Sequence, residues 1–190
     1  MCIVLRQLTR DDFNEVMDLF TTVFIDGYEV KYPDIFSREA KMRQDLDELL
    51  KFCIDSGYSY GVFVDDKRLV SFCLAADINS LIDKNFLFLK TFDNEDMGKD
   101  PYLKHIREYE DEYGVVSPEI YIFYVGTDED FRNQHYVSKI VFRIQEEMGR
   151  GYLFGVIPDK ILSNLFKGHS TCKTWPLING YSFAATEVNK

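Results

Sequence analysis

The segment from residue 119 to residue 157 constrains the fold more than any other part of this chain. Its first stretch, from Glu119 to Val125, is almost continuously apolar and aromatic, which is typical of a strand buried on both faces. After a polar loop, apolar residues recur at three- and four-residue spacing over 136–148, which predicts an amphipathic helix. A second apolar run at 152–157 predicts another buried strand. The segment therefore predicts a βαβ unit with parallel strands and a right-handed crossover.

The remaining predicted elements are arranged around this unit. Before it the sequence predicts a strand at 2–8, a helix at 13–24 behind Thr9 as N-cap, a helix from Ser37 to about Ile54, and a hairpin of strands at 60–64 and 69–75. Residues 79–117 fit this order less well, and we interpret them as an insertion with a helix near 101–113. After the unit we expect a short helix near 159–167 and a last strand near 180–188.

Length and composition favour a single globular domain. The chain has 190 residues, of which 46% are hydrophobic and 15% aromatic, enough to form a core without a metal or disulfides. We therefore expect one domain over 1–190, with the insertion at about 79–117.

Several classes of protein are disfavoured by what the sequence lacks. No signal peptide and no apolar stretch of membrane-spanning length is evident, so we expect no membrane partner. The four cysteines are scattered and no ligands stand at metal spacing, which indicates a reduced, cytoplasmic protein without a metal site. A formal net charge of -10 argues against nucleic acid and is compatible with a cationic acceptor, although many cytoplasmic proteins are simply acidic.

The order of elements, together with one motif, resembles the GNAT superfamily of N-acetyltransferases. The family's motif, [QR]-x-x-G-x-[GA], follows the fourth strand and opens a helix. The segment from Thr127 to Arg132 is similar to the family's approach to this turn, including the aromatic Phe131 just before Arg132. The resemblance implies an α/β fold (α+β in some schemes), the GNAT-like acyl-CoA N-acyltransferase fold, in which helices flank a mixed central sheet.

The resemblance also implies acetyl-CoA as the acyl-donor substrate. A helix N-terminus presents backbone N–H groups and a favourable dipole to an anion, so it suits the pyrophosphate of CoA. The candidate binding residues are Val125, Gly126, Thr127, Arg132, Asn133, Gln134, His135, Tyr136, Val137 and Ser138.

The motif is degenerate in this chain. His135 stands where the family has its first glycine, and Val137 stands where it has Gly or Ala. The backbone N–H groups survive these changes, but the space above the turn is reduced. His135 would add a cationic contact to phosphate if its pKa were raised there, and the alternative is an ordinary histidine at an exposed helix start.

Two residues of the predicted fourth strand are candidates for catalysis. The resemblance implies a glutamate base on this strand, which matches Glu119, and Tyr121 shares its face. The alternatives are a solvated carboxylate at a strand start and a tyrosine of the core. The family's tyrosine acid aligns with Phe166, which has no proton to give, and the nearby substitutes are Ser163, Tyr181 and Cys172. We expect the acceptor site to involve residues 28–36 and the insertion.

Three hypotheses of function follow. The first is an acetyl-CoA-dependent N-acetyltransferase that acts on the amine of a small molecule or peptide. The second is a GNAT-like binding or regulatory module with impaired CoA binding, and the third is an acyltransferase with another acyl donor. A homodimer is compatible with apolar stretches such as Leu87 to Leu89.

Overall fold

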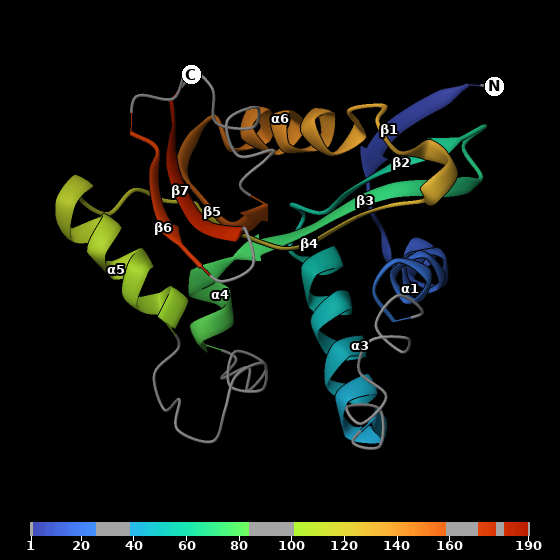
Figure 1. The fold of residues 1–190 in the computed structure, drawn as a ribbon, viewed down its shortest axis with the longest axis horizontal. Coiled ribbons are helices and arrows are strands. Elements are labelled where there is room, and N and C mark those ends of the chain that lie inside the picture. Colours follow the sequence, from blue (N-terminus) through green and yellow to red (C-terminus); the bar gives the residue numbers. More distant parts are fainter. Residues whose placement is uncertain (1, 26–38, 84–100, 159–170, 178–180, 190) are drawn as a thin grey trace. The chain divides into compact units, whose positions relative to one another are not determined.

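The computed structural model describes residues 2–25, 39–83, 101–158, 171–177 and 181–189. The strands are β1 (Ile3–Gln7), β2 (Tyr60–Val64), β3 (Arg68–Asp77), β4 (Glu119–Thr127), β5 (Arg150–Pro158), β6 (Lys173–Pro176) and β7 (Tyr181–Asn189) (Figure 1). The helices are α1 (Phe13–Phe20), α3 (Glu39–Asp55), α4 (Ile78–Asp83), α5 (Pro101–Tyr113) and α6 (Tyr136–Met148), with short 3₁₀ and π turns beside them.

The strands form one mixed sheet in the order β1-β2-β3-β4-β5-β7-β6. β1 pairs with β2, and β2 with β3, in antiparallel fashion. β4 and β5 pair in parallel, with Glu119 opposite Tyr152, whereas β7 is antiparallel to both β5 and β6. The parallel pair and the intervening α6 confirm the predicted βαβ unit, and helices flank the sheet as expected.

The chain divides into two compact units, each built from two pieces of sequence. The first comprises Met1–Ala76 and Tyr124–Ile144, and the second comprises Asp77–Phe123 and Gln145–Lys190. Both β4 and α6 contribute residues to each unit. Whether the chain forms a single domain stays a prediction.

In the first unit, α6 covers one face of the strands, and α1 and α3 cover the other (Figure 1). The first helical turn is fixed by Asp12, whose carboxylate accepts hydrogen bonds from the Thr9 backbone N–H at 2.8 Å and from two guanidinium nitrogens of Arg6, each at 2.8 Å. Arg6 lowers the pKa of Asp12 to about 2. This ion pair links β1 to the start of α1 through a carboxylate that is largely buried.

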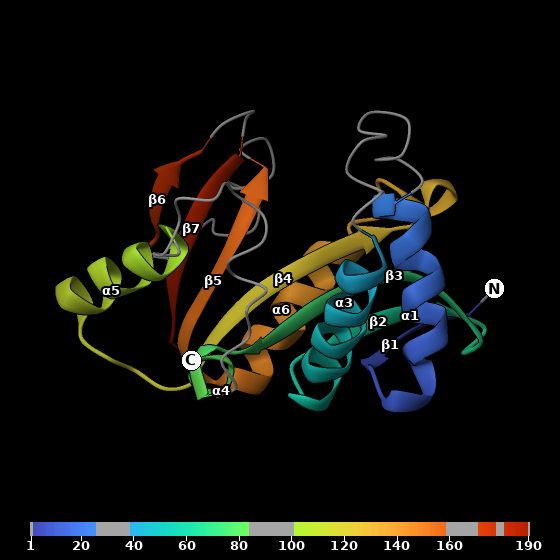
Figure 2. The same ribbon diagram turned by 90° about the horizontal axis from the view of Figure 1, so that it is seen from below.

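In the second unit, α5 packs against β5, β7 and β6 (Figure 2). The core between them is mainly aromatic. It consists of Ile78, Ile106, Tyr109, Tyr121, Tyr152, Phe154, Phe183 and Ala185. The helix predicted near 101–113 is confirmed as α5. Its apolar residues Ile106 and Tyr109 are part of this core.

Some elements differ from the prediction. The expected helix at 13–24 ends at Phe20 and continues as a π-helical turn, Thr21–Ile25. α4 and β6 were not predicted, since six and four residues are too few to show a period. Ser37 and the helix expected near 159–167 lie outside the described residues. None of the described helices is long and apolar enough to cross a membrane.

Candidate functional site

The loop between β4 and α6 is fastened to β3 by charge. The Asp128 carboxylate accepts a hydrogen bond from Arg68 Nη2 at 2.7 Å and another from the Asp130 backbone N–H at 3.1 Å. The Arg68 guanidinium also lies over the Phe131 ring, 5.4 Å from its centroid. These contacts fix the 3₁₀ turn, Glu129–Phe131, that leads the chain toward α6.

Two residues just before α6 adopt a backbone conformation that favours glycine. Asn133 has a φ of 64° and His135 a φ of 58°, both in the left-handed region. Asparagine tolerates this region well, whereas histidine is strained there by about 1 kcal/mol. The structure therefore has a glycine-type conformation at His135, where the resemblance implies a glycine.

The start of α6 offers backbone donors to an anion. The Lys139 N–H donates to the His135 carbonyl at 3.1 Å, which is the first hydrogen bond of the helix. The N–H groups in the turn before Lys139 consequently have no partner within the helix. Arg132 to His135 are exposed, Val137 and Ser138 are half-buried, and the Tyr136 side chain is buried. A phosphate on these N–H groups would also gain from the helix dipole.

The last residues of β4 have mainly a structural role. The Ser71 hydroxyl donates to the Gly126 carbonyl at 3.0 Å and lies 2.9 Å from the Thr127 hydroxyl. A Cβ at Gly126 would meet the Phe72 ring at 2.7 Å, so only glycine fits there. Val125 is half-buried beside them. Of the candidate binding residues, those in the turn are therefore the ones exposed to a ligand.

Glu119, at the start of β4, is buried rather than solvated. Its exposed fraction is 2%, and its Oε2 accepts a hydrogen bond from Asn79 Nδ2 at 3.3 Å. Oε1 is buried and has no hydrogen-bond partner among the described residues. Burial raises the pKa of Glu119 to about 7, with the Glu110 and Asp77 carboxylates adding to the rise and Asn79 opposing it. A carboxyl group with such a pKa can accept or donate a proton near neutral pH.

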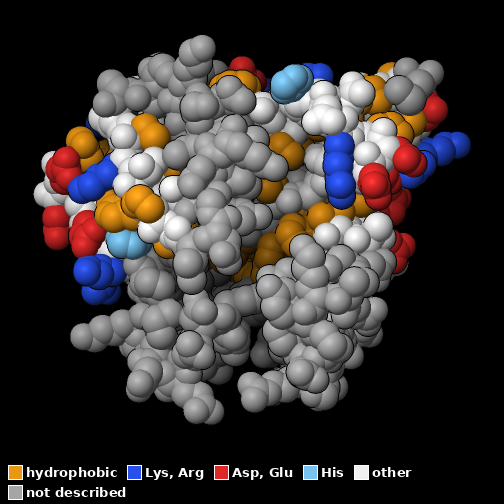
Figure 3. All heavy atoms as spheres, viewed as in Figure 1, with side chains coloured by type: hydrophobic (Ala, Val, Ile, Leu, Met, Phe, Trp, Pro, Cys, Tyr) orange, Lys and Arg blue, Asp and Glu red, His pale blue; other side chains and the backbone are white. Residues whose placement is uncertain are grey.

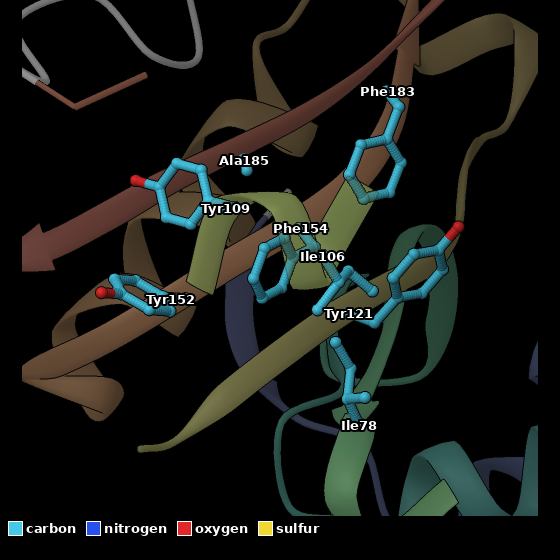
Figure 4. Close-up of a cluster of buried hydrophobic side chains, with 8 residues drawn as sticks. All are labelled: Ile78, Ile106, Tyr109, Tyr121, Tyr152, Phe154, Phe183 and Ala185. Carbon is cyan, nitrogen blue, oxygen red and sulfur yellow. The ribbon is translucent and has the colours of Figure 1, made fainter. Parts of the chain in front are cut away.

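Tyr121 is part of the aromatic core of the second unit. It is 8% exposed, and its ring lies 4.7 Å from that of Phe123 and 6.4 Å from that of Phe183. Figure 4 shows its hydroxyl pointing to the opposite side of the cluster from those of Tyr109 and Tyr152. The structure thus brings Tyr121 onto the same packed face as Tyr152, the residue opposite Glu119.

Three residues near Glu119 were not predicted as part of the site. Asp77 ends β3, Asn79 belongs to α4 and Glu110 belongs to α5. These residues come near Glu119 only when their elements fold against β4. The periodicity of a single element therefore could not have identified them.

The remaining candidates contribute less. Phe166, Ser163 and residues 28–36 lie outside the described residues, while Cys172 is exposed and Tyr181 begins β7. Within the described ranges no group of His, Cys, Asp or Glu side chains is arranged to hold a metal ion.

With its mixed seven-stranded sheet, flanking helices and central βαβ unit, the chain has the GNAT-type acyl-CoA N-acyltransferase fold. It is similar over 100% of both chains to a polyamine N-acetyltransferase of Drosophila melanogaster, with 12% identity and a TM-score of 0.62. It is equally similar over 100% of both chains to arylalkylamine N-acetyltransferase 2 of Aedes aegypti, with 13% identity and a TM-score of 0.62.

A further similar structure is the PaiA N-acetyltransferase of Thermoplasma acidophilum, solved in complex with coenzyme A. It has 10% identity and a TM-score of 0.57, and the match covers 98% of this chain and 99% of that one. No protein-family model and no curated protein sequence matches the chain. At these identities the similarity establishes the fold.

Proposed function

We propose that the protein is an acetyl-CoA-dependent N-acetyltransferase that acylates an amine of a small molecule or peptide. The observation that carries the proposal is the turn at 128–135, which presents the exposed N-terminus of α6 directly after β4. The similar structures are N-acetyltransferases, and they match this fold along almost their whole length. Together these observations favour acyl transfer over other uses of the fold.

In the proposed reaction the CoA pyrophosphate binds the backbone N–H groups of residues 133–138. This placement needs no particular side chain, so the changes at His135 and Val137 leave the donors intact. Arg132, exposed next to the turn, adds a positive charge.

The acceptor amine must lose a proton to become a nucleophile. In our proposal its nitrogen attacks the thioester carbonyl carbon, the C–S bond breaks, and Glu119 takes the proton from the amine. The raised pKa of Glu119, about 7, suits this role at neutral pH. The CoA thiolate takes a proton from water, since the position aligned with the family's acid is Phe166.

The first test is thermal unfolding of the protein with and without acetyl-CoA or free CoA at millimolar concentration. A ligand at 100 times its dissociation constant adds about 2.7 kcal/mol, which is a clear rise in midpoint. We expect both ligands to raise the midpoint of thermal unfolding. In a separate assay with a panel of amines, we then expect the protein to transfer the acyl group. Absence of any rise would exclude the proposal, and a larger rise with longer acyl-CoAs would indicate another acyl donor.

A binding module that has lost efficient CoA binding is the second candidate. The strained φ of His135 and the bulk of Val137 favour it. His135→Gly relieves the strain and opens the turn, so it distinguishes the two candidates. Binding that is present before this substitution supports the enzyme, and binding that appears only after it supports the module.

A further inference from the structure

A small cavity in the first unit lies between the beginning of α1 and the last turns of α3. It has a volume of about 110 Å³ and is lined by Arg10, Phe13, Lys51 and Ile54. Ile54 is 4% exposed and Phe13 is half-buried, whereas Arg10 and Lys51 are exposed. A ligand in this cavity would therefore meet hydrocarbon on the inside and positively charged groups at the opening.

Arg10 is held in position by a carboxylate of α3. Its Nε and Nη2 donate to the two carboxylate oxygens of Asp55, at 2.7 and 2.5 Å. This pairing orients the planar guanidinium and offsets its charge. It uses one edge of the group, and Nη1 has no hydrogen-bond partner among the described residues. Arg10 can therefore still donate to a ligand through Nη1.

Lys51 is held at the cavity by an aromatic ring instead of a carboxylate. Its Nζ lies 4.7 Å from the centroid of the Phe13 ring, and a ring face attracts an ammonium group. In the part of the chain that the structure describes, no carboxylate forms an ion pair with Lys51. Since Asp55 compensates Arg10, the charge of Lys51 is the uncompensated one.

We propose that this cavity is a binding site for a small monocarboxylate with a short hydrocarbon chain. The carboxylate accepts hydrogen bonds from Lys51 Nζ and Arg10 Nη1, and the hydrocarbon chain lies against Phe13 and Ile54. A ligand with one negative charge matches the uncompensated charge of Lys51. A phosphate or a dicarboxylate would bring a second negative charge, which the Asp55 carboxylate repels.

The size of the cavity limits the length of the ligand. A volume of about 110 Å³ equals roughly four times the volume that a water molecule occupies in the liquid. This space accommodates a chain of about four carbon atoms, as in butyrate, with the carboxylate at the opening. Because so few atoms make contact, we expect a dissociation constant of about 1 mM.

This site is separate from the turn that is proposed to bind CoA. Arg10 and Phe13 lie at the beginning of α1, whereas Phe20, at its end, packs against Tyr124 of β4 with 4.9 Å between the ring centroids. The inference therefore goes beyond the proposed function, and its test gives a result whether or not acetyl-CoA binds. Its ligand would connect α1 to α3.

The proposal is tested by titration of the full chain with sodium butyrate, followed in NMR spectra of the backbone amide groups. Sodium chloride keeps the ionic strength constant, and 1-butanol is the neutral control ligand. We expect saturable shifts that are largest at residues 10–13 and 51–55, with butanol bound at least about fivefold more weakly. Shifts that do not saturate, that lie elsewhere, or that are equally strong with butanol overturn the proposal.

Substitution of Lys51 tests the source of the specificity. Lys51→Met keeps an apolar side chain over Phe13 and removes the charge, so it should weaken butyrate binding at least about fivefold and leave butanol binding unchanged. Lys67→Met removes an exposed lysine outside the cavity and should change neither. Unchanged butyrate binding in Lys51→Met contradicts the proposal. Thermal midpoints of both variants show that they are folded.

Discussion

At the scale of single residues, Glu119 is a carboxyl group whose burial costs free energy. A carboxylate is stable in water, and burial at 2% exposure beside Glu110 and Asp77 removes that stabilisation. The group responds by holding its proton to a higher pH. The free energy for this must come from the surrounding packing, in which Tyr152 and Tyr121 take part.

This cost predicts how stability depends on pH. The pKa of Glu119 rises from an ordinary 4.5 to about 7, so the folded protein binds more protons than the unfolded chain between these values. The free energy of unfolding should therefore fall as pH rises through this window, by an amount on the order of 3 kcal/mol. Chemical denaturation at a series of pH values measures the slope.

The substitution Glu119→Gln should remove this slope, because an amide does not titrate. Glu48→Gln, at an exposed position of α3, is the matched control and should retain it. Asp12 does not obscure the measurement, because its pKa is lowered and its contribution is lost only as pH falls below 3.8 toward 2. A slope that persists in Glu119→Gln would show that another group titrates in this window.

The sequence predicts Glu119 but not its environment. Its position at the start of an apolar strand, together with the family resemblance, singled out the residue. Whether its carboxylate is solvated depends on α5 and α4, and these elements meet β4 only in the folded chain. Glu110 stood in a charged stretch, 105–113, where no local pattern distinguishes it from Glu108 or Glu112.

At the scale of elements, the loop after β4 depends on a contact from β3. Arg68 is bonded to Asp128 and lies over Phe131, so it holds the loop that delivers the chain to α6. Its side chain is 59% exposed, and such an ion pair contributes at most about 1 kcal/mol. Loss of this free energy would change the stability of the whole protein little. It would be enough to let the turn before α6 shift its position.

Accordingly, Arg68→Met should weaken acetyl-CoA binding about threefold to fivefold with little change in the thermal midpoint. Lys67→Met, at the exposed neighbouring position, removes the same charge without touching the loop and serves as control. Titration calorimetry measures both dissociation constants. Equal weakening in both variants would point to the loss of charge rather than to the loop.

Long elements were predicted well and short ones poorly. The 13 residues of α6 and the strands on either side show their periods clearly, because each buries a regular set of side chains. β6 has only four residues, and it is a strand because β7 pairs with it. The apolar spacing in the sequence continues through residue 24 and so predicts a longer α-helix. In the structure the backbone changes to a π-helical turn at Thr21–Ile25.

At the scale of the whole molecule, the dominant property is the formal net charge of -10. Figure 3 shows acidic side chains interspersed with basic ones on the described surface of one face. A negative field of this kind attracts a cationic substrate from a distance and is screened by salt. It acts on the rate of encounter rather than on the chemical step.

For the proposed enzyme, kcat/KM for a cationic amine should fall severalfold between about 20 and 200 mM salt, while kcat changes little. Steady-state kinetics with acetyl-CoA at saturation measures both constants. A fall in kcat of the same size would instead assign the effect of salt to the chemical step or to product release.

The short strand β6 has a consequence for how the protein behaves among other copies of itself. It forms one border of the sheet, ends after four residues, and carries Pro176, which has no N–H to offer. Lys173 adds a charge at its other end. A foreign strand that approached this border would find few hydrogen bonds to make, so the border is protected against the edge-to-edge pairing that leads to aggregation.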